Sequence, residues 1–474
     1  MIIAREKELS ILKGVLRDEK SHFIAVYGRR RIGKTFLIRE AFGYRFTFQH
    51  AGLSSGGLKE QIFAFEASVK DAGGQASDKR KNWLEAFEDL KDLIRNSSEA
   101  KKIVFIDELS WMDTQNGDLL IALENFWNGW ASSRKDIVLI VCASATSWMM
   151  SKIIHSKGGL YNRLTEQIAL KAFNLAECEE YVRSGSIALN RQQILQFYMV
   201  FGGVPYYWSF YQKGLSVARN IDRMLFDPEA PLKDEFKYLY ASIFKKPEMY
   251  IRIVQTLGRK KAGMTREELI SESGIINSGD LTTKLEELES CGFIRKYNAY
   301  GMKRKNAVYQ LMDFFTLFYY QFMAEEPTDN QFWSHQINTP SVNTWQGLAF
   351  VRVCLDHVNQ IKNKLGISGV LTEVNSWYCK TDTEKGIFGS QIDLLIARKD
   401  QIINLCEIKY SGSEYMLTEK TDMSIRHKIN DLVAVTGTKY AIHPTMITCY
   451  GLVDNSYSGN IQSVITMDDL FAQI

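Results

Sequence analysis

The stretch HFIAVYGRRRIGKTFLIREAF, residues 22–42, decides how the first part of this chain folds. An apolar run is followed by a glycine-containing loop and then by residues with helical periodicity. Gly28, Gly33, Lys34 and Thr35 meet the spacing GxxxxGK[ST], in which loop N–H groups and a helix N-terminus face phosphate groups. The stretch therefore predicts a strand, a phosphate-binding loop (P-loop) and a helix, as in an α/β domain built on a parallel sheet.

The predicted loop is suited to Mg-ATP. Lys34 would reach the β- and γ-phosphates, and the Thr35 hydroxyl would ligate Mg²⁺. An incidental glycine-rich turn is the competing interpretation, and the strand and helix predicted on either side argue against it. We expect nucleotide contacts along the whole loop, from Gly28, Arg29, Arg30, Arg31, Ile32, Gly33, Lys34 and Thr35.

A second element supplies the carboxylates that an ATP site needs. The segment IVFIDELSWM, residues 103–112, reads as a strand that ends in Asp107 and Glu108. Both acids would therefore lie at the carboxyl end of a strand, where ligands bind in open α/β sheets. We assign Asp107 to the surroundings of the metal and Glu108 to polarising the attacking water.

Two further residues follow predicted strand ends or loops. Ser144, in VLIVCASATSWMM, is placed where a hydroxyl could contact the γ-phosphate, and a simple strand-to-helix cap is the alternative. Arg163 follows a glycine-containing loop, from which a guanidinium could reach the transferred phosphate in cis or across a subunit interface. A solvated surface arginine is the competing interpretation of Arg163.

Length and composition set the broad class. With 474 residues, of which 45% are apolar and 24% charged, the chain is long enough for several globular domains. The net charge of +3 is too small to indicate a nucleic-acid partner by itself. The seven cysteines are scattered without a CxxC spacing, and no run of about 18 apolar residues occurs. We therefore expect a cytoplasmic protein without a membrane span, a disulfide framework or a zinc site.

Several motifs together resemble a known family, the archaeal-type ATPases of the AAA+/STAND group of P-loop proteins, which also occur in many bacteria. The resemblance rests on the P-loop and FIDELSWM, and on AREKELSIL (4–12), CASATSWM (142–149), LYNRLTEQIAL (160–170) and FGGVPYYW (201–208). It implies that Arg5 and Glu6 lie near the adenine, and that Gly203 and Pro205 line the lid side of the site. One departure is Ala143, where the family usually has glycine.

The resemblance also implies a multidomain α/β architecture with four parts. These are a P-loop ATPase core (1–172), a helical lid (173–230), a winged helix-turn-helix with a trailing helix (231–325) and a C-terminal domain (342–474). The last domain is similar to PD-(D/E)xK nucleases, which have the restriction-endonuclease-like fold.

The expected winged helix has an ambiguous surface. Thr265 and Glu268 predict a capping box for one of its helices. The recognition helix would be Ser278–Ser290, whose charges nearly cancel, which disfavours contact with phosphates. The wing carries a basic cluster around Tyr297 and Tyr300. Its members are Arg295, Lys296, Lys303, Arg304 and Lys305. DNA contact and docking of a protein both remain open for this part of the chain.

The C-terminal domain contains QIDLLIARKDQIINLCEIK, residues 391–409. Two paired strands would place Asp393, Glu407 and Lys409 on one sheet face, because side chains two apart share a face. Asp393 and Glu407 would hold Mg²⁺, and Lys409 would lower the pKa of the attacking water or orient it. Gln391 shares the face of Asp393 and could assist.

One acid of the nuclease pattern is missing. The fold usually adds a carboxylate from the preceding helix, where this chain has Val351. Glu373 or Asp356 could replace it, and a nuclease fold retained only for binding or structure is the alternative.

These expectations lead to three functional hypotheses. The first is an ATPase that binds DNA and cleaves it with Mg²⁺, with nuclease activity left open. The second is a nucleotide-switched signalling or scaffold ATPase with an inactive nuclease-like domain. The third is DNA binding without cleavage. The expected ligands are ATP and Mg²⁺, and the expected partners are DNA and, if Arg163 acts in trans, a second copy of the chain.

Overall fold

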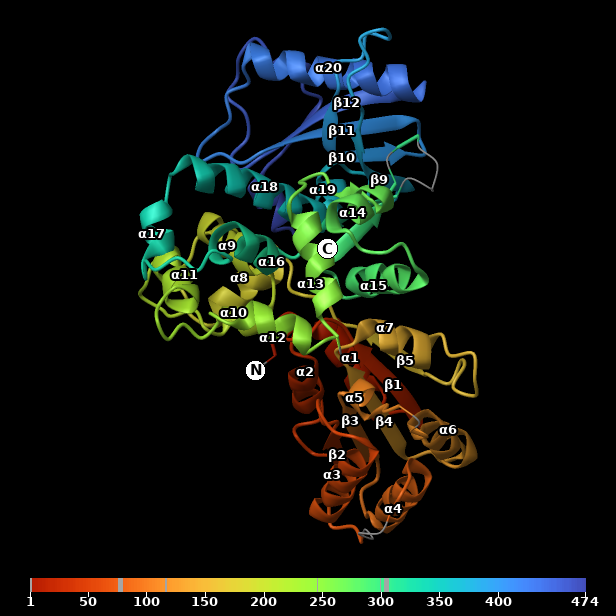
Figure 1. The fold of residues 1–474 in the computed structure, drawn as a ribbon. Helices are drawn as coiled ribbons and strands as arrows, with labels where there is room; N and C mark the ends of the chain where they lie inside the picture. The colour runs from red at the N-terminus through yellow and green to blue at the C-terminus, as the bar shows by residue number, and fades with distance from the viewer. Residues whose placement is uncertain (1, 76–79, 116, 245, 299, 302–306) are drawn as a thin grey trace. The chain divides into compact units, whose positions relative to one another are not determined.

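The computed structural model of this protein describes residues 2–75, 80–115, 117–244, 246–298, 300–301 and 307–474. The chain forms two compact units, drawn in Figure 1. Unit 1 comprises Met1–Ala172, Val204–Tyr206 and Tyr238–Pro247, and unit 2 comprises Phe173–Gly203, Tyr207–Lys237 and Glu248–Ile474. Most of the segment expected as a lid, 173–230, therefore belongs to unit 2.

Unit 1 is built on a five-stranded sheet in which every pairing is parallel. The parallel sheet predicted from the P-loop region is thus confirmed. Its order is β2 (Phe48–Ala51), β3 (Lys102–Asp107), β4 (Ile137–Ala143), β1 (His22–Tyr27), β5 (Glu166–Ala169). The central strand β4, IVLIVCA, is buried along its whole length, as expected for a parallel strand covered on both faces.

Helices cover both faces of this sheet. Phe23 and Ala25 pack into one core with α3, α4 and α6, whereas Ile24 and Val26 pack into another with α1 and α2. Alternate side chains of β1 thus face opposite layers. The helices of unit 1 are α1 (Glu6–Gly14), α2 (Lys34–Ala41), α3 (Leu58–Asp71), α4 (Trp83–Asn96), α5 (Leu109–Met112), α6 (Leu119–Gly129), η1 (Ala131–Ser133), α7 (Thr146–Trp148) and η2 (Met149–Ile154).

Unit 2 begins with helices whose N-termini are capped by asparagine. Asn174 and Asn190 each form a capping box with the residue three positions on, which satisfies N–H groups that the first turn leaves unpaired. These helices are α8 (Leu175–Ser184) and α9 (Arg191–Phe201), followed by α10 (Pro205–Trp208), α11 (Val217–Leu225) and α12 (Glu235–Ala241), of which α10 and α12 have residues in both units.

Three helices and a small antiparallel sheet come next. The predicted capping box of Thr265 and Glu268 is confirmed, and Ser278 caps the helix expected from that residue onward. The elements are α13 (Glu248–Gly258), α14 (Arg266–Ser273) and α15 (Gly279–Ser290), with a sheet in the order β6 (Met264–Thr265), β8 (Val308–Leu311), β7 (Ile294–Tyr297). Helical segments α16 (Phe314–Phe318), η4 (Tyr319–Met323) and α17 (Phe332–Gln336) follow.

The C-terminal part is a mixed five-stranded sheet with α20 packed on it. Strands β10 and β11 form an antiparallel hairpin, and β12 lies parallel to β11 after the crossover through α20. The order is β13 (Ser463–Ile465), β12 (Ala441–Thr448), β11 (Ile402–Lys409), β10 (Gln391–Arg398), β9 (Thr372–Tyr378). The accompanying helices are α18 (Pro340–Asp356), α19 (Val358–Lys364), α20 (Glu419–Thr436), η5 (Ser458–Asn460) and α21 (Met467–Leu470). Of the helices described, none is long and apolar enough to cross a membrane.

Candidate nucleotide site and a second carboxylate cluster

Five predicted residues of unit 1 meet at the carboxyl edge of its sheet. Strands β3, β4 and β1 are neighbours and parallel, so their carboxyl ends lie side by side. The Thr35 hydroxyl donates a hydrogen bond to Asp107 Oδ2 (2.6 Å). The Lys34 ammonium donates to Ser144 Oγ (3.1 Å), and Ser144 Oγ donates to Glu108 Oε1 (2.7 Å). The structure therefore joins these five side chains in one local group.

The loop before α2 has the backbone shape that its glycines permit. Gly28 has a φ of +142° and Gly33 a φ of +89°, values that residues with a Cβ rarely adopt. A Cβ on Gly28 would lie 2.2 Å from the Leu170 carbonyl oxygen, so this position also needs glycine for space. Lys34 Nζ lies inside the loop, where it donates to the carbonyls of Gly28 and Arg29, each at 2.9 Å.

Glu108 is held in an unusual conformation. It has a φ of +49° at the N-terminus of α5, in the left-handed region that costs energy for a residue with a side chain. Its carboxylate accepts from both the hydroxyl and the backbone N–H of Ser144, at 2.7 and 3.3 Å. The two contacts fix the direction of the carboxylate at the end of β3.

Other residues predicted to contact the nucleotide make contacts with neighbouring parts of unit 1. Arg5 is buried and donates to the Lys171 carbonyl (2.6 Å), while Ile32 packs into the core that α1 and α2 form against the sheet. Arg31 lies over the Tyr206 ring, 4.3 Å from its centroid, next to Pro205 at the start of α10. The guanidinium of Arg30 donates to the carbonyl of Ser242 (3.3 Å).

Arg163 is not brought to this group by any contact the structure describes. It is exposed on the segment before β5, and its Nε donates to the Gly159 carbonyl of the same segment (3.4 Å). Its guanidinium therefore makes a local contact, and the predicted role of Arg163 stays a prediction.

A second carboxylate cluster lies on the C-terminal sheet. Leu394 and Cys406 are paired in antiparallel register. Asp393 precedes Leu394 and Glu407 follows Cys406, which places the two acids opposite each other on one face. Gln391 Nε2 donates to Asp393 Oδ1 (2.8 Å), and Lys409 Nζ lies 2.9 Å from Glu407 Oε1. The structure thus brings these four predicted residues to one sheet face.

Lys428 belongs to the same cluster and was not predicted. Its ammonium, on α20, lies 2.6 Å from Glu407 Oε2. Burial would raise the pKa of Glu407, but Lys428 and Lys409 together hold that pKa below its ordinary value. Burial would likewise lower the pKa of Lys409, and Glu407 raises it. Glu407 is therefore an ionised carboxylate balanced by two ammonium groups.

The suggested replacements for the missing helix acid have different positions. Glu373 pairs in register with Ala397, four residues from Asp393, and its carboxylate lies 3.3 Å from Lys399. It is therefore at the wrong end of β10 to join the cluster. Asp356 is exposed at the end of α18. No group of three or more His, Cys, Asp or Glu among the described residues could hold a metal ion.

The expected basic cluster on the wing needs a correction. Arg295 is turned inward, where its guanidinium donates to Gln310 Oε1 and Ser376 Oγ, each at 2.5 Å. Burial lowers the pKa of Arg295 to about 10, and Tyr297 beside it is also buried. Arg295 thus ties β7 to β9, while Lys296 is exposed. The other three members, Lys303–Lys305, lie outside the described residues.

A family model matches the N-terminal part of the chain. Residues 2–209 match the family model described as an ATPase domain predominantly from Archaea. The uncharacterized protein MJECL04 of Methanocaldococcus jannaschii is 23% identical over 83% of this chain and 84% of its own length. Among solved structures, the Walker-type ATPase PABY2304 of Pyrococcus abyssi is 16% identical, covers 68% of this chain and 96% of its own, and has a TM-score of 0.48.

A further similar solved structure is the ORC2 protein of Aeropyrum pernix in ADPNP and ADP complexes. It is 14% identical, covers 75% of this chain and 96% of its own, and has a TM-score of 0.39. The family match spans the P-loop and both other strand ends described above. The chain is therefore an ATPase, which binds and hydrolyses ATP.

Proposed function

We propose that the five joined residues of unit 1 form the ATP site. Lys34 would contact the β- and γ-phosphates, Ser144 would contact the γ-phosphate, and Glu108 would accept a proton from the attacking water. The 2.6 Å contact between Thr35 and Asp107 carries the proposal, because it brings together two oxygen groups of the kind that Mg²⁺ prefers. Mg²⁺ bound there would neutralise developing charge on the phosphates.

Two variants separate binding from hydrolysis at this site. Lys34→Ala should abolish binding of a fluorescent ATP analogue, because the ammonium group that contacts the phosphates is gone. Glu108→Gln should retain binding but lose at least about 100-fold in turnover, because the base is gone. Phe63→Ala, an exposed residue of α3, is the matched control. Full turnover in Glu108→Gln would contradict the assignment.

For unit 2 we propose a DNA-directed role. In this proposal α13–α15 with the β7–β8 hairpin act as a winged helix, and the sheet β9–β13 acts as a PD-(D/E)xK-like domain. The opposed Asp393 and Glu407, with Lys409 two residues from Glu407, support this assignment. Asp393 and Glu407 offer carboxylate oxygens for Mg²⁺, and Lys409 would orient the water that attacks a phosphodiester.

The cleavage proposal has a direct test. The purified chain should cut DNA in the presence of Mg²⁺ and ATP, and Lys409→Ala should abolish cutting while ATP hydrolysis continues. Lys399→Ala, which removes an exposed lysine in the turn between β10 and β11, is the control. If linear, circular and single-stranded DNA and RNA all stay intact, the chain is not a nuclease under these conditions and this part of the proposal fails.

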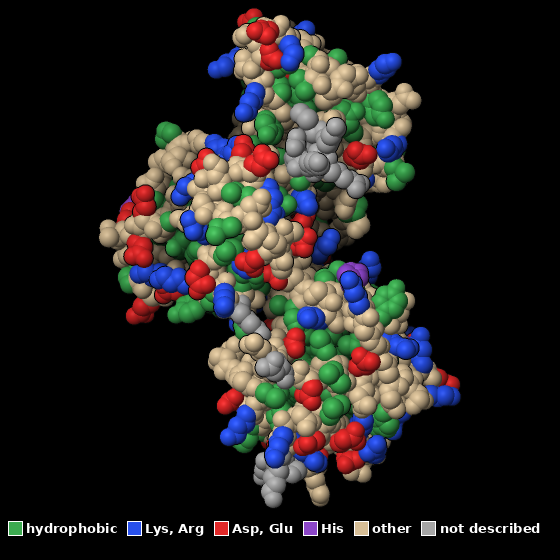
Figure 2. Space-filling model, turned by 45° about the vertical axis from the view of Figure 1, so that its right-hand side comes forward, with side chains coloured by type: hydrophobic (Ala, Val, Ile, Leu, Met, Phe, Trp, Pro, Cys, Tyr) green, Lys and Arg blue, Asp and Glu red, His purple; other side chains and the backbone are tan. Residues whose placement is uncertain are grey.

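A nucleotide-switched scaffold is the second candidate, and specific contacts favour it. Two ammonium groups already balance Glu407, and Arg295, expected on the DNA-facing wing, is turned inward. On the face seen in Figure 2, lysine and arginine side chains are interspersed with acidic ones. This version predicts an ATP-dependent change in oligomeric state. Identical size-exclusion profiles for the nucleotide-free, ATP and ADP forms would contradict it.

DNA binding without cleavage, the third candidate, would appear as a salt-sensitive gel shift without cleavage products.

Several further expectations stay proposals. These are the four-part division into 1–172, 173–230, 231–325 and 342–474, the contacts of Arg5 and Pro205 with the nucleotide, the action of Arg163 and a cytoplasmic location.

A further inference from the structure

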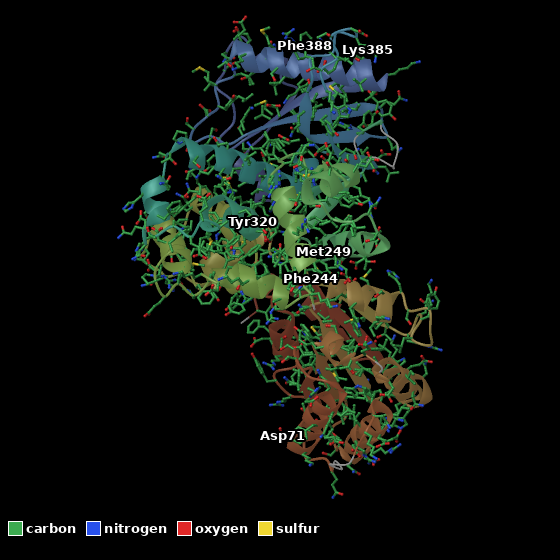
Figure 3. The ribbon with its side chains drawn as sticks, in the orientation of Figure 1. Asp71, Phe244, Met249, Tyr320, Lys385 and Phe388 are labelled. Atoms are coloured by element: carbon green, nitrogen blue, oxygen red, sulfur yellow. The ribbon has the colours of Figure 1, made fainter. Side chains whose placement is uncertain are left out.

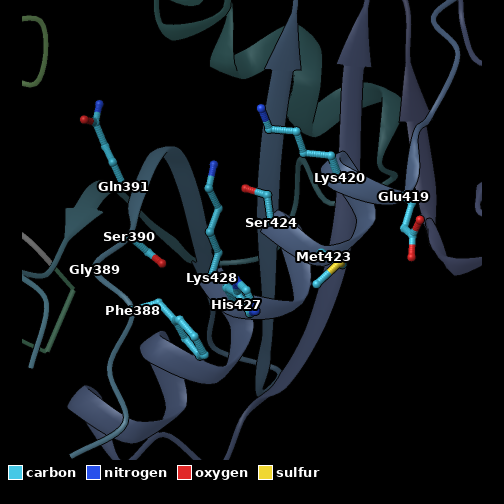
Figure 4. A pocket seen from close by; sticks show the side chains of 10 residues that line it. All are labelled: Phe388, Gly389, Ser390, Gln391, Glu419, Lys420, Met423, Ser424, His427 and Lys428. Atoms are coloured by element: carbon cyan, nitrogen blue, oxygen red, sulfur yellow. The ribbon is translucent and has the colours of Figure 1, made fainter. Parts of the chain in front are cut away.

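A pocket of about 710 Å³ opens in the C-terminal part of unit 2 (Figure 4). Its volume is within the range of about 300–1,000 Å³ that is typical of small-ligand sites. One wall is the segment that leads into β10, and the other is the first half of α20. The lining side chains are Phe388, Ser390, Gln391, Glu419, Lys420, Met423, Ser424, His427 and Lys428, together with Gly389.

An aromatic pair forms the apolar part of this pocket. The rings of Phe388 and His427 are stacked, with centroids 4.0 Å apart and planes 9° from parallel. Phe388 nevertheless remains 57% exposed and Met423 remains 48% exposed. Figure 3 places Phe388 beside α20. Both residues line the pocket, and a planar ligand could cover the exposed face of the Phe388 ring.

Hydrogen bonds to Asp431 hold the segment that carries Phe388 in place. The buried carboxylate of Asp431 accepts from the Phe388 N–H (3.0 Å) and from the Ser390 hydroxyl (2.5 Å). The Cys379 thiol donates to the same carboxylate (3.8 Å). Three contacts from one helix residue thus fix the segment before β10 on α20, so the stacking ring is positioned in advance of any ligand.

The polar end of the pocket meets the carboxylate cluster. Lys428 lines the pocket and also pairs with Glu407, and Gln391 lines it and also bonds to Asp393. Lys420 adds a second ammonium group on the same helix. A ligand that stacks on Phe388 would therefore have cations for a phosphate at one end and the proposed cleavage residues beyond them.

We propose that this pocket receives one unpaired nucleotide of a nucleic-acid strand, with its base on Phe388 and its phosphate at Lys420 and Lys428. Bases in a duplex are already stacked on their neighbours, so only a single-stranded or extruded base can reach this ring. The inference rests on the proposed nucleic-acid role of unit 2. It adds that the cluster at Glu407 acts next to an unpaired base.

The test is binding of labelled oligonucleotides to the full chain at low salt. The probes are a fluorescein-labelled oligo(dT) of 12 nucleotides, a 12-base-pair duplex and dTMP, with ADP present at saturation to occupy the site at Lys34. Phe388→Ala should weaken oligo(dT) binding by roughly 5- to 150-fold, the usual effect of losing one base–aromatic stack. Phe388→Trp should retain binding, and Phe63→Ala, another exposed phenylalanine, should have no effect.

Each outcome bears on a different claim. Unchanged oligo(dT) affinity in Phe388→Ala overturns the stacking pocket, and the DNA proposal survives if that variant still binds the duplex. Binding of dTMP as tight as that of oligo(dT) means that the pocket takes a free nucleotide, which overturns the strand assignment. If the unmodified chain binds none of the three probes, both the pocket and the DNA proposal fail.

Discussion

Protonation of His357 should destabilise unit 2. The ring is fully buried, and its Nε2 accepts a hydrogen bond from the backbone N–H of Leu175 (3.0 Å), the first residue of α8. Nδ1 lies 2.8 Å from the Val353 carbonyl, so these partners assign the proton of the neutral ring to Nδ1. A second proton, on Nε2, would point at the Leu175 N–H, and this N–H would lose its hydrogen-bond acceptor.

The magnitude follows from the pKa of the ring. Burial lowers the pKa of His357 to about 4, from an ordinary value of 6.5, although the Val353 carbonyl acts in the opposite direction. A lowered histidine pKa means that the stability is fully present above pH 6.5 and is lost as the pH falls towards 4. Linkage gives a loss of about 2 kcal/mol between pH 7.5 and 5 and about 3 kcal/mol by pH 4.

The assay compares the chain with His357→Gln, whose amide does not titrate in this range. Urea unfolding at pH 7.5, 6 and 5 gives the free energy of each form, and hydrogen exchange of the peptide around Leu175 reports the local contact. The difference between the two forms should shrink by about 2 kcal/mol between pH 7.5 and 5. His50→Gln is the control for the exchange measurement: His50 has a similarly lowered pKa but lies in unit 1, so its replacement should leave exchange around Leu175 unchanged.

A constant difference between the two forms across this pH range would refute the reasoning. It would mean that His357 is not a neutral acceptor in the folded chain, or that its ring is open to water. Unchanged exchange at Leu175 in the variant would show separately that the helix N-terminus does not depend on this hydrogen bond.

Four further substitutions test packing in unit 2. Gly203→Ala would place a methyl group 1.7 Å from the Phe173 carbonyl oxygen, so we expect little soluble protein on expression. Gly347→Ala, inside α18 with no atom within 4 Å, should instead raise the free energy of unfolding by up to about 1 kcal/mol, measured in urea. Asp222→Ala should cost about 2–4 kcal/mol, because it leaves the buried N–H of Trp333 without its acceptor; Asp222→Asn should cost less in the same assay.

The grouping of the residues proposed for ATP could be predicted from sequence because it is set by local rules. Parallel strands deliver their carboxyl ends to one edge, so a P-loop after β1 and acids after β3 must lie close together. That is why Thr35 and Asp107, 72 residues apart, are found in contact. Arg163 follows no such rule, since a long segment after η2 can lead its side chain in many directions.

The residues around Glu407 show where such prediction stops. Strand alternation placed Asp393, Glu407 and Lys409 on one face, because a period of two needs no tertiary information. Lys428 could not be found this way, since its position depends on how α20 packs on the sheet. The prediction that Arg295 belongs to a basic cluster on the wing was wrong for a related reason. Its polar partners, Gln310 and Ser376, are 15 and 81 residues away in the sequence. Their hydrogen bonds offset the cost of turning a charged guanidinium inward.

The anchoring of Cys379 at Asp431 gives this protein a natural attachment point for a reporter group. Six of its seven cysteines are buried, and Cys379 is partly accessible. Burial raises the pKa of the Cys379 thiol, so maleimide coupling should proceed faster in mildly alkaline buffer than at neutral pH. A dye at this position would lie next to Asp431, whose carboxylate also holds the Phe388 backbone. It could report occupancy of the pocket without first replacing the other six cysteines.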